Sequence, residues 1–230
     1  MSEIRKYAVI VAGGQGLRMD SAIPKQFLPL LGKPLLCHAI ESFAQAIPGI
    51  KLILVLPANH VGSAQTVLRS YLGGVDVTTV AGGATRYDSV KNGLKEVKDN
   101  GIVFVHDGAR PLVSEELIIR CYKHAVEFGS AIPAIPVAES VRMMTADGSK
   151  PLDRDNMRII QTPQTFRTEV ILPAFEQSYQ PSFTDEATVV EAFGTKIHMV
   201  EGMYGNLKVT TPNDMIIAEA LLKERMHEFA

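Results

Sequence analysis

The chain has 230 residues, and its 23 Lys and Arg against 25 Asp and Glu give a formal net charge of -2. A near-neutral charge provides no electrostatic footprint for nucleic acid or for an anionic membrane surface. Hydrophobic residues form 46% and charged residues 21% of the chain, which is typical of a globular protein with a sizeable core. No apolar run reaches the length of a membrane span, and the first residues contain no signal-peptide core. We therefore expect a cytoplasmic protein that binds neither nucleic acid nor membrane.

The first predicted element is a buried strand over residues 7–12, because the run Tyr-Ala-Val-Ile-Val-Ala is apolar on both faces. It is followed by three glycines, Gly13, Gly14 and Gly16. Glycines let the backbone turn with positive φ and let a ligand approach without meeting a Cβ. The bare N–H groups of such a turn attract anions, and Arg18 and Lys25 add positive charge nearby. We interpret this stretch as a loop that holds phosphate groups.

The two commonest phosphate motifs are absent from this loop. A P-loop needs Gly, four residues and then Gly-Lys-Ser/Thr, which the chain does not contain. The dinucleotide fingerprint needs a third glycine three residues after the second, where this chain has Met19. The remaining alternative is a tight strand–helix turn with incidental charge, but three glycines with Arg18 and Lys25 exceed what a turn requires.

Strands and helices alternate after this loop. Further strands are predicted at residues 51–56, 75–80, 102–105 and 130–137, and helices at residues 34–47, 60–72, 85–97 and 114–128. Pro133 and Pro136 make the last of these strands partly irregular or place it near an edge. The alternation predicts an α/β fold, a Rossmann-like open and mostly parallel sheet with helices on both faces.

Three polar segments each follow a predicted strand: the glycine loop, the pair Gly82-Gly83, and His106-Asp107. Ligands of such sheets bind beyond the carboxyl ends of the strands, so we expect these segments to form one site. One strand-end carboxylate is enough for Mg²⁺ when substrate phosphates supply the other ligands, and Asp107 is the candidate. The alternative for Asp107 is a helix cap or an ion pair with Arg110. A histidine beside a strand end, as at position 106, is more often hydrogen-bonded structure than catalyst.

Several polar residues remain ambiguous when the residues are considered singly. Ser89 and the glycine pair before it fit contacts to a base and ribose, but they also fit a turn and a helical serine. Arg86 is equally a solvated helix charge, and Arg154 is by default a surface charge. Lys208 is either an exposed strand lysine or a ligand of a substrate phosphate.

Residues 138–160 differ from the rest of the chain, because they are rich in charge and lack helical periodicity. They form either a solvated excursion or a dimerisation arm, and they are too short for an independent domain. We therefore expect one domain over residues 1–230, with an arm at residues 138–158. Beyond the arm we predict helices ending at Phe175 and at Gly194, short strands at residues 196–200 and 206–210, and a last helix from Pro212.

Cys37 and Cys121 are the two cysteines of the chain, and both fall in predicted helices. They have no partner at metal-ligand spacing, so no structural zinc site is encoded. We expect two reduced, buried thiols.

A set of motifs follows in order along nearly the whole chain. They are Gly-Gly-Gln-Gly-Leu-Arg-Met at 13–19, Pro-Lys-Gln-Phe at 24–27, Gly-Gly-Ala-Thr-Arg-Tyr-Asp-Ser-Val at 82–90, His-Asp-Gly-Ala-Arg-Pro at 106–111, Asp-Arg at 153–154, Gln-Thr-Pro-Gln-Thr-Phe at 161–166, Thr-Asp-Glu-Ala at 184–187 and Gly-Asn-Leu-Lys-Val-Thr-Thr-Pro at 205–212. Each is modest by itself, but the ordered set is specific. It resembles the 2-C-methyl-D-erythritol 4-phosphate cytidylyltransferases of isoprenoid synthesis.

The resemblance implies that CTP and methylerythritol 4-phosphate react to give the CDP-polyol and pyrophosphate, with Mg²⁺ at Asp107. Arg18 and Lys25 match the pair that stabilises the transition state, and Lys208 and Arg154 match residues that position the acceptor phosphate. The nucleotide is expected at Ala12, Gly13, Gly14, Gly16, Gly82, Gly83, Arg86 and Ser89. The acceptor is expected at Arg110, Ser140, Thr184 and Asp185.

In the family the acceptor-binding arginine comes from the partner subunit, so the resemblance also implies a homodimer that exchanges the arm at residues 138–158. Ser140 stands where a threonine is common, a change that keeps the hydroxyl group. Gly108 is a small-for-small change beside Asp107.

Three other functions remain open from the sequence. Ribitol-5-phosphate cytidylyltransferase shares the fold and most motifs, although Asp153-Arg154 and the Thr-Asp-Glu run from position 184 look more like the methylerythritol enzyme. A sugar-phosphate nucleotidyltransferase that uses another nucleotide is a more distant alternative. A non-catalytic nucleotide-binding module is disfavoured, because binding alone does not require all four charges of Arg18, Lys25, Asp107 and Lys208.

Overall fold

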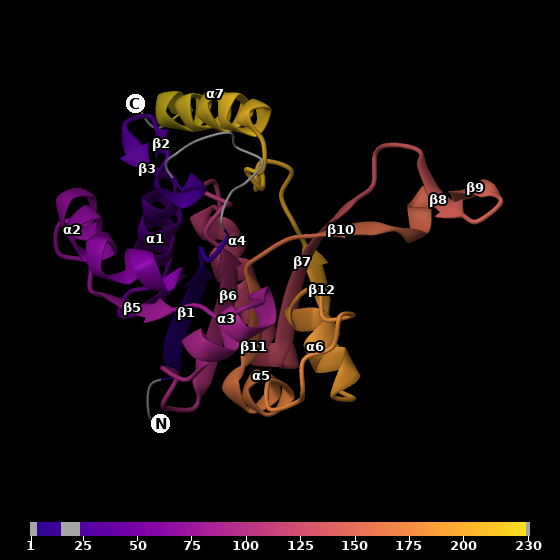
Figure 1. The fold of residues 1–230 in the computed structure, drawn as a ribbon, viewed down its shortest axis with the longest axis horizontal. Coiled ribbons are helices and arrows are strands. Elements are labelled where there is room, and N and C mark those ends of the chain that lie inside the picture. Colours follow the sequence, from indigo (N-terminus) through magenta and orange to yellow (C-terminus); the bar gives the residue numbers. More distant parts are fainter. Residues whose placement is uncertain (1–3, 15–23, 229–230) are drawn as a thin grey trace.

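The computed structural model describes residues 4–14 and 24–228. Its centre is a twisted sheet in which four strands are parallel: β1 (Arg5–Val11), β4 (Lys51–Leu56), β5 (Val77–Ala81) and β6 (Gly101–Asp107). The strand β11 (Gln164–Arg167) pairs antiparallel with β6 and with β7 (Ser130–Pro136). Two short strands also pair with β7: β12 (Met199–Glu201) is parallel to it and β10 (Arg158–Ile160) is antiparallel. The sheet is therefore open, mixed and mostly parallel (Figure 1).

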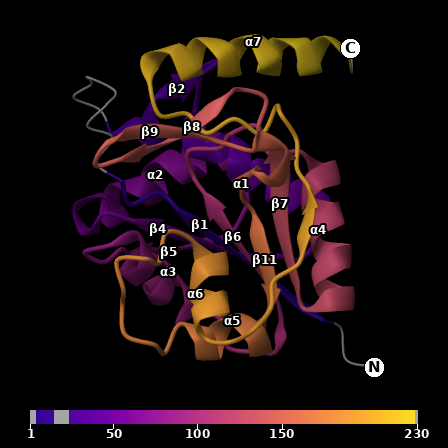
Figure 2. The same ribbon diagram turned by 90° about the vertical axis from the view of Figure 1, so that its right-hand side faces the viewer.

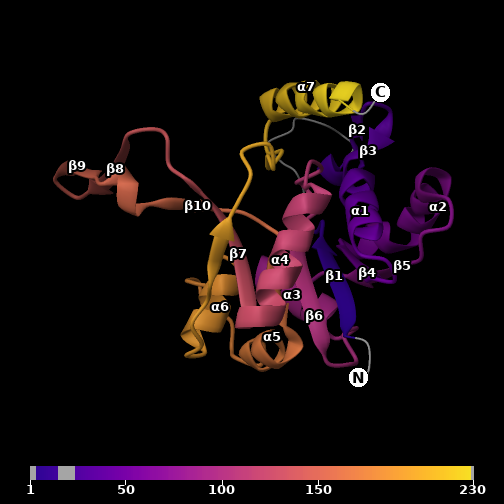
Figure 3. The same cartoon turned by 180° about the vertical axis from the view of Figure 1, so that it is seen from behind.

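Helices cover both faces of the sheet, because successive side chains of each parallel strand point to opposite sides. Ala8 and Ile10 of β1 pack in one core with α1 (Leu35–Ala46), α2 (Val61–Leu72) and α4 (Glu115–Phe128). Tyr7 and Val9 pack in a second core with α3 (Arg86–Leu94), α5 (Thr168–Ala174) and α6 (Glu186–Ala192). Figures 1 and 3, which view opposite faces, show α3 and α4 respectively in front of the strands.

Short signals in the sequence set the ends of these helices. Ser114 caps α4 by accepting a hydrogen bond from the Leu117 N–H, and the helix ends at Gly129 in the left-handed region. Thr85 and Asp88 form a reciprocal capping box at the start of α3. This cap fixes the point at which the chain leaves the glycine pair 82–83 and enters the helix.

The last helix, α7 (Pro212–Glu228), lies across the carboxyl ends of the parallel strands (Figure 2). Its Ala218 is buried in a small cluster with Leu30, from the hairpin of β2 (Pro29–Leu30) and β3 (Lys33–Pro34), and with Val209. The described residues also form one-turn 3-10 helices: η2 (Lys25–Phe27), η3 (Ala58–His60) and η4 (Arg154–Asn156). Among the described residues, no helix has both the length and the apolar character to cross a bilayer.

The charged segment after β7 forms a hairpin of β8 (Val141–Thr145) and β9 (Gly148–Leu152) that extends away from the sheet (Figure 1). Most of its side chains are exposed, including Met144 at 77%. This hairpin and its flanking residues, 138–158, are called the arm below. Its role in dimerisation stays a prediction.

The strand expected at residues 102–105 runs on through His106 and Asp107, and Asp107 ends it as predicted. The strand expected at residues 206–210 is wrong, because this segment is an extended loop. Its Val209 N–H donates to the Ala109 carbonyl (2.8 Å), but the segment forms no strand ladder with any described residue. The predicted position of residues 130–137 near an edge is confirmed, since β7 lies beside the short strand β12.

Candidate active site

The carboxyl ends of β1 and β5 meet at the hydroxyl group of Ser89. The Gly83 N–H donates a hydrogen bond to Ser89 Oγ (3.1 Å), and the hydroxyl donates to the Thr85 carbonyl (2.9 Å). A Cβ at Gly82 would lie 2.9 Å from the same oxygen, and one at Gly13 would lie 3.4 Å from it. The predicted nucleotide-binding residues Gly13, Gly82, Gly83 and Ser89 are therefore neighbours. A side chain at position 82 would press on this hydroxyl group and disturb its hydrogen bonds.

The carboxyl ends of β1 and β6 also lie against each other. The Gly108 N–H donates to the Val11 carbonyl (2.8 Å), and a Cβ at Gly108 would lie 3.0 Å from the Cβ of Ala12. The small residue after Asp107 thus lets the end of β6 lie against the start of the glycine loop. Ala12 and Asp107 are brought to one place by this contact.

Asp107 is surrounded by cations. Lys208 Nζ lies 2.7 Å from Asp107 Oδ2, and Arg110 Nε lies 3.8 Å from the same oxygen. Arg86 Nη2 lies 3.1 Å from Oδ1. Burial raises the pKa of the Asp107 carboxyl, but Arg86, Lys208 and Arg110 outweigh that effect and hold its pKa well below the usual range. Asp107 is therefore a permanent carboxylate at the carboxyl edge of the sheet.

Arg86 also binds a second carboxylate, that of Glu186. The two guanidinium nitrogens Nη1 and Nη2 contact Oε1 and Oε2 of Glu186, at 2.5 and 3.1 Å. Burial lowers the pKa of the Arg86 guanidinium, but Glu186 and Asp107 raise it on balance. Three cations against two carboxylates leave this cluster with one positive charge, which suits an anionic ligand.

Sequence reasoning placed Arg86, Arg110 and Lys208 as separate candidates, and the structure unites them at one carboxylate. It did not assign a role to Glu186, which stood in the Thr-Asp-Glu-Ala motif as an acid at the start of a helix. No local signal in the sequence pointed to this pairing, because Arg86 and Glu186 are 100 residues apart.

His106 holds the end of β6 in place and carries no charge. Thr162 Oγ1 accepts a hydrogen bond from the Asp107 N–H (3.0 Å), so its own proton points to His106 Nδ1 (3.1 Å). The other ring nitrogen, Nε2, then donates to the Arg110 carbonyl (3.1 Å). Burial lowers the pKa of His106 to about 4. The structural interpretation of His106 is confirmed, since both of its nitrogens are used within the fold.

The loop that carries Lys208 is tied to the same framework. Asn206 Nδ2 donates to the Thr162 carbonyl (2.7 Å), and Arg110 Nη1 donates to the Asn206 carbonyl (2.7 Å). Arg110 Nε and Asn206 Oδ1 are buried without a hydrogen-bond partner. Polar groups buried in this way are costly unless a ligand or water engages them. These contacts explain why an irregular segment can hold Lys208 at Asp107.

The remaining predicted site residues lie at the border of the charged cluster around Asp107 or away from it. Asp185 caps α6 by accepting from the Thr188 N–H, and its second oxygen accepts from Gln164 Nε2 (2.8 Å). Thr184 is exposed and precedes it, one residue further from Glu186. Lys25 opens η2. Gly14 is exposed at the end of the described part of the loop, while Gly16 and Arg18 lie outside the described residues.

Ser140 and Arg154 are not brought to the cluster within one chain. Ser140 is exposed at the base of the arm, and Arg154 Nη1 donates to the Ala138 carbonyl on the same arm (2.6 Å). The hairpin that follows carries this segment away from the sheet (Figure 1).

A magnesium ion would find one protein ligand here. The described residues contain no group of three or more His, Cys, Asp or Glu side chains that could hold a metal. Asp107 is ionised and supplies hard oxygen donors, and each carboxylate offers about four lone-pair directions. Because Mg²⁺ is held by one or two carboxylates with substrate phosphates, the residues present fit that ion.

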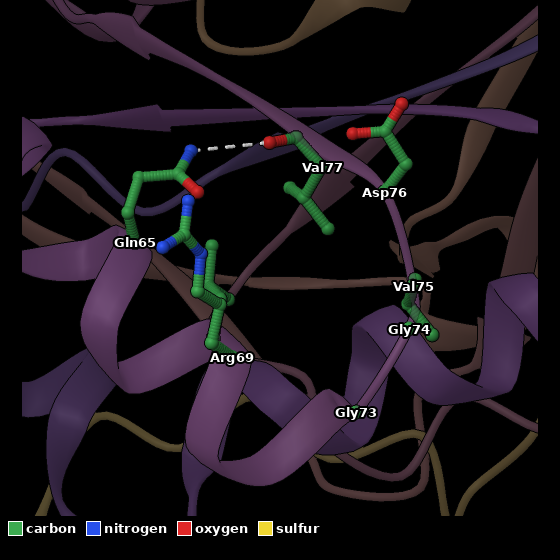
Figure 4. Close-up of a pocket in the computed structure, with 8 residues that line it drawn as sticks. Gln65, Arg69, Gly73, Gly74, Val75, Asp76 and Val77 are labelled. Carbon is green, nitrogen blue, oxygen red and sulfur yellow. Dashed lines mark hydrogen bonds between the residues drawn. The ribbon is translucent and has the colours of Figure 1, made fainter.

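A surface pocket lies away from this edge of the sheet (Figure 4). It is lined by Gln65 and Arg69 of α2 and by residues 73–77, which lead into β5. Gln65 Nε2 donates to the Val77 carbonyl (3.3 Å), so this amide serves the fold. Val77 is the first residue of β5 and Gly82 follows its last. The pocket therefore lies at the amino end of the strand, opposite the edge that carries Asp107.

A glycine turn and a cation-rich carboxylate at the carboxyl edge of a parallel sheet define a nucleotide-handling α/β enzyme. Residues 7–224 match the family model described as 2-C-methyl-D-erythritol 4-phosphate cytidylyltransferase. The chain belongs to this family, and is therefore a nucleotidyltransferase.

Similar proteins span the same length. Proteins named 2-C-methyl-D-erythritol 4-phosphate cytidylyltransferase are 45% identical to this chain in Bacteroides fragilis, over 94% of this chain and 98% of theirs, and 45% identical in Porphyromonas gingivalis W83, over 96% and 99%. A crystal structure of 4-diphosphocytidyl-2C-methyl-D-erythritol synthase from Anaerococcus prevotii has a TM-score of 0.81 and 28% identity, covering 96% of each chain. The predicted α/β fold and the resemblance are both confirmed.

Proposed function

We propose that this protein transfers CMP from CTP to 2-C-methyl-D-erythritol 4-phosphate. The products are 4-diphosphocytidyl-2-C-methyl-D-erythritol and pyrophosphate, on the route to isoprenoid precursors. The observation that carries the proposal is the family match over residues 7–224, almost the whole chain. The cation cluster around Asp107 supports it, because it lies at the edge of the sheet where a nucleotide binds.

The reaction needs charge and position more than proton transfer. An oxygen of the acceptor phosphate forms a bond to the α-phosphorus of CTP, and the bond from that phosphorus to the bridging oxygen breaks as pyrophosphate leaves. The second pKa of a phosphate monoester is about 6, so this nucleophile is already ionised at neutral pH. No general base is required. The neutral, fully bonded His106 is consistent with this, since it has no role in moving a proton.

The protein's cations neutralise charge that builds during the transfer. Glycine N–H groups at positions 13 and 14 hold the triphosphate, and Lys25 and Arg18 stabilise the α-phosphate and the departing pyrophosphate. Lys208 orients the acceptor phosphate, and Arg110, whose guanidinium faces Asp107 and binds the Asn206 carbonyl, adds positive charge beside it. Main-chain groups at Gly82 and Gly83 contact the base and ribose, with Ser89 holding Gly83 in place.

Magnesium is the proposed cofactor, with Asp107 as its protein ligand. When bound, the ion supplies positive charge to the phosphate oxygens of CTP. Asp107 is suited to hold it, because its pKa lies well below the usual range and the carboxylate persists at every physiological pH. Another divalent cation with a preference for oxygen is compatible with the same ligand.

The arm suggests how the acceptor site is completed. Arg154 and Ser140 lie on a hairpin that leaves the body of the chain, so they reach a cluster at Asp107 only if the arm enters a second copy. We therefore propose a homodimer in which each arm, residues 138–158, contributes Arg154 to the partner's acceptor site. The substrates carry several negative charges that a bilayer excludes, so the proposed place of reaction is the cytoplasm.

The proposed function is tested by pyrophosphate release. The purified protein is mixed with Mg²⁺, CTP and either 2-C-methyl-D-erythritol 4-phosphate or D-ribitol 5-phosphate, and UTP, ATP and GTP replace CTP in matched reactions. We expect turnover with CTP and the methylerythritol phosphate. Turnover with ribitol 5-phosphate alone would replace the proposal by the ribitol function, and turnover with another nucleotide would replace the cytidylyl assignment. If no combination of nucleotide and polyol phosphate releases pyrophosphate, the remaining interpretation is a non-catalytic nucleotide-binding module.

A further inference from the structure

Glu186 fixes the orientation of Arg86. Its carboxylate binds Nη1 and Nη2 of the guanidinium through both oxygens, and such a fork sets the plane of the arginine. The remaining edge of the guanidinium, Nε and Nη2, then faces Asp107 Oδ1 at 3.3 and 3.1 Å. Glu186 therefore decides which edge Arg86 presents to Asp107.

As a result, the two oxygens of the Asp107 carboxylate bind different cations. Arg86 uses Oδ1, while Oδ2 faces Lys208 at 2.7 Å. An arginine without Glu186 could turn and bind both oxygens of Asp107 in its own fork. It would then compete with Lys208 and with any ligand of Oδ2.

Stability alone does not explain a carboxylate at this position. The side chain of Glu186 is 1% exposed, and burial raises the pKa of its carboxyl against the opposing effect of Arg86. A buried ion pair is often no more stable than an apolar replacement of similar size, and Ala187 and Val190 next to it already face the core. If Glu186 served only to stabilise the N-terminus of α6 through its charge, it could do so while exposed to water.

We propose that Glu186 is a positioning residue for the cytidylyl transfer, an inference that rests on the function proposed above. It touches no substrate. It holds Arg86 so that Asp107 Oδ2 stays directed at Lys208 and the nucleotide. Because Glu186 follows Thr184 and Asp185 directly, it also ties the predicted acceptor-binding segment to an arginine on the nucleotide side.

Glu186→Gln is the principal variant, because it keeps the size of the side chain. One end of the amide is a donor, so either orientation places N–H against a guanidinium nitrogen and breaks the fork. Arg86→Lys keeps the charge but cannot bridge two carboxylates in one plane. The matched control is Glu191→Gln, the same change at an exposed position of the same helix. Each variant is measured for kcat and KM, for CTP binding by calorimetry with and without Mg²⁺, and for unfolding by circular dichroism.

We expect Glu186→Gln and Arg86→Lys each to lower kcat by about tenfold or more, the range seen when a group that orients a ligand is removed. For Glu186→Gln, the dissociation constant of CTP without Mg²⁺ should change less than about threefold, while the gain in affinity that Mg²⁺ provides should fall. Combining Glu186→Gln with Arg86→Lys should cost no more than the worse single variant, because both break the same link.

The inference is overturned by three results: Glu186→Gln behaves like Glu191→Gln, its whole effect is a loss of folded protein with kcat of the folded fraction intact, or the two losses multiply in the combined variant. If Glu186→Gln does not fold, Arg86→Lys decides the matter by the same measurements. The wild-type reaction separates this inference from the proposed function. No turnover by the wild type refutes the function, whereas normal turnover by the variants refutes only the role of Glu186.

Discussion

Gly93 tests how tightly α3, the helix that carries Arg86 and Ser89, is seated on the sheet. A Cβ at this position would lie 2.5 Å from Val9 Cγ1 and 2.8 Å from Val55 Cγ2. Both valines are fully buried, and β-branched side chains have little freedom to turn away. Alanine favours a helix over glycine by about 1 kcal/mol, but overpacking a filled core costs about 1–3 kcal/mol. With two clashes against rigid neighbours, we expect Gly93→Ala to lower the free energy of unfolding by about 1–2 kcal/mol.

Gly62 in α2 is the matched control. It is exposed, and a Cβ there would meet no atom within 4 Å. The identical change, Gly62→Ala, should raise the free energy of unfolding by about 0.5 kcal/mol, because it restricts only the unfolded chain. The two variants should therefore differ from the wild type with opposite signs.

Equilibrium unfolding in urea, followed by circular dichroism, measures both free energies under one condition. Because α3 positions Arg86, Gly93→Ala should also lower kcat, while Gly62→Ala should not. A Gly93→Ala protein as stable as the wild type, or stabilised like Gly62→Ala, would refute the claim that α3 is packed without space for a methyl group.

Three further predictions concern the chemistry. Lys25→Ala should lower kcat much more than it raises KM for CTP, because Lys25 is assigned to charge that develops in the transition state; a change confined to KM would assign it to ground-state binding. Arg154→Ala should impair use of the polyol phosphate and leave CTP binding intact. If arms are exchanged between subunits, mixing the Arg154→Ala and Lys25→Ala proteins should restore part of the activity. Mixtures without activity would contradict the exchange. Burial raises the pKa of Cys37 and of Cys121 to about 12, so neither thiol should react with a thiol reagent at pH 8 in the folded protein and both should react in denaturant; rapid labelling of the native protein would contradict their burial.

Local patterns in the sequence were enough for most of the fold. Apolar runs such as residues 51–56 are buried on both faces, so their strand character does not depend on distant partners. The cap at Ser114 and the stop at Gly129 are encoded in a few adjacent residues, and both ends of α4 were predicted correctly. The strand prediction for residues 206–210 was wrong for the opposite reason. Its alternation resembled a strand, but its shape is set by contacts of Asn206 and Val209 with residues about a hundred positions earlier.

The sequence by itself was enough to predict which segments bind phosphate, because glycines, a strand end and nearby cations are adjacent along the chain. It also determined that Asp107 ends a buried strand. Only the tertiary structure decided which charges meet there. Arg86 and Glu186 are 100 residues apart, and Lys208 and Asp107 are as distant, so no local pattern pairs them. Long side chains find their partners through the packing of whole elements, and here α3, α6 and an irregular loop bring three cations and two carboxylates to one edge of the sheet.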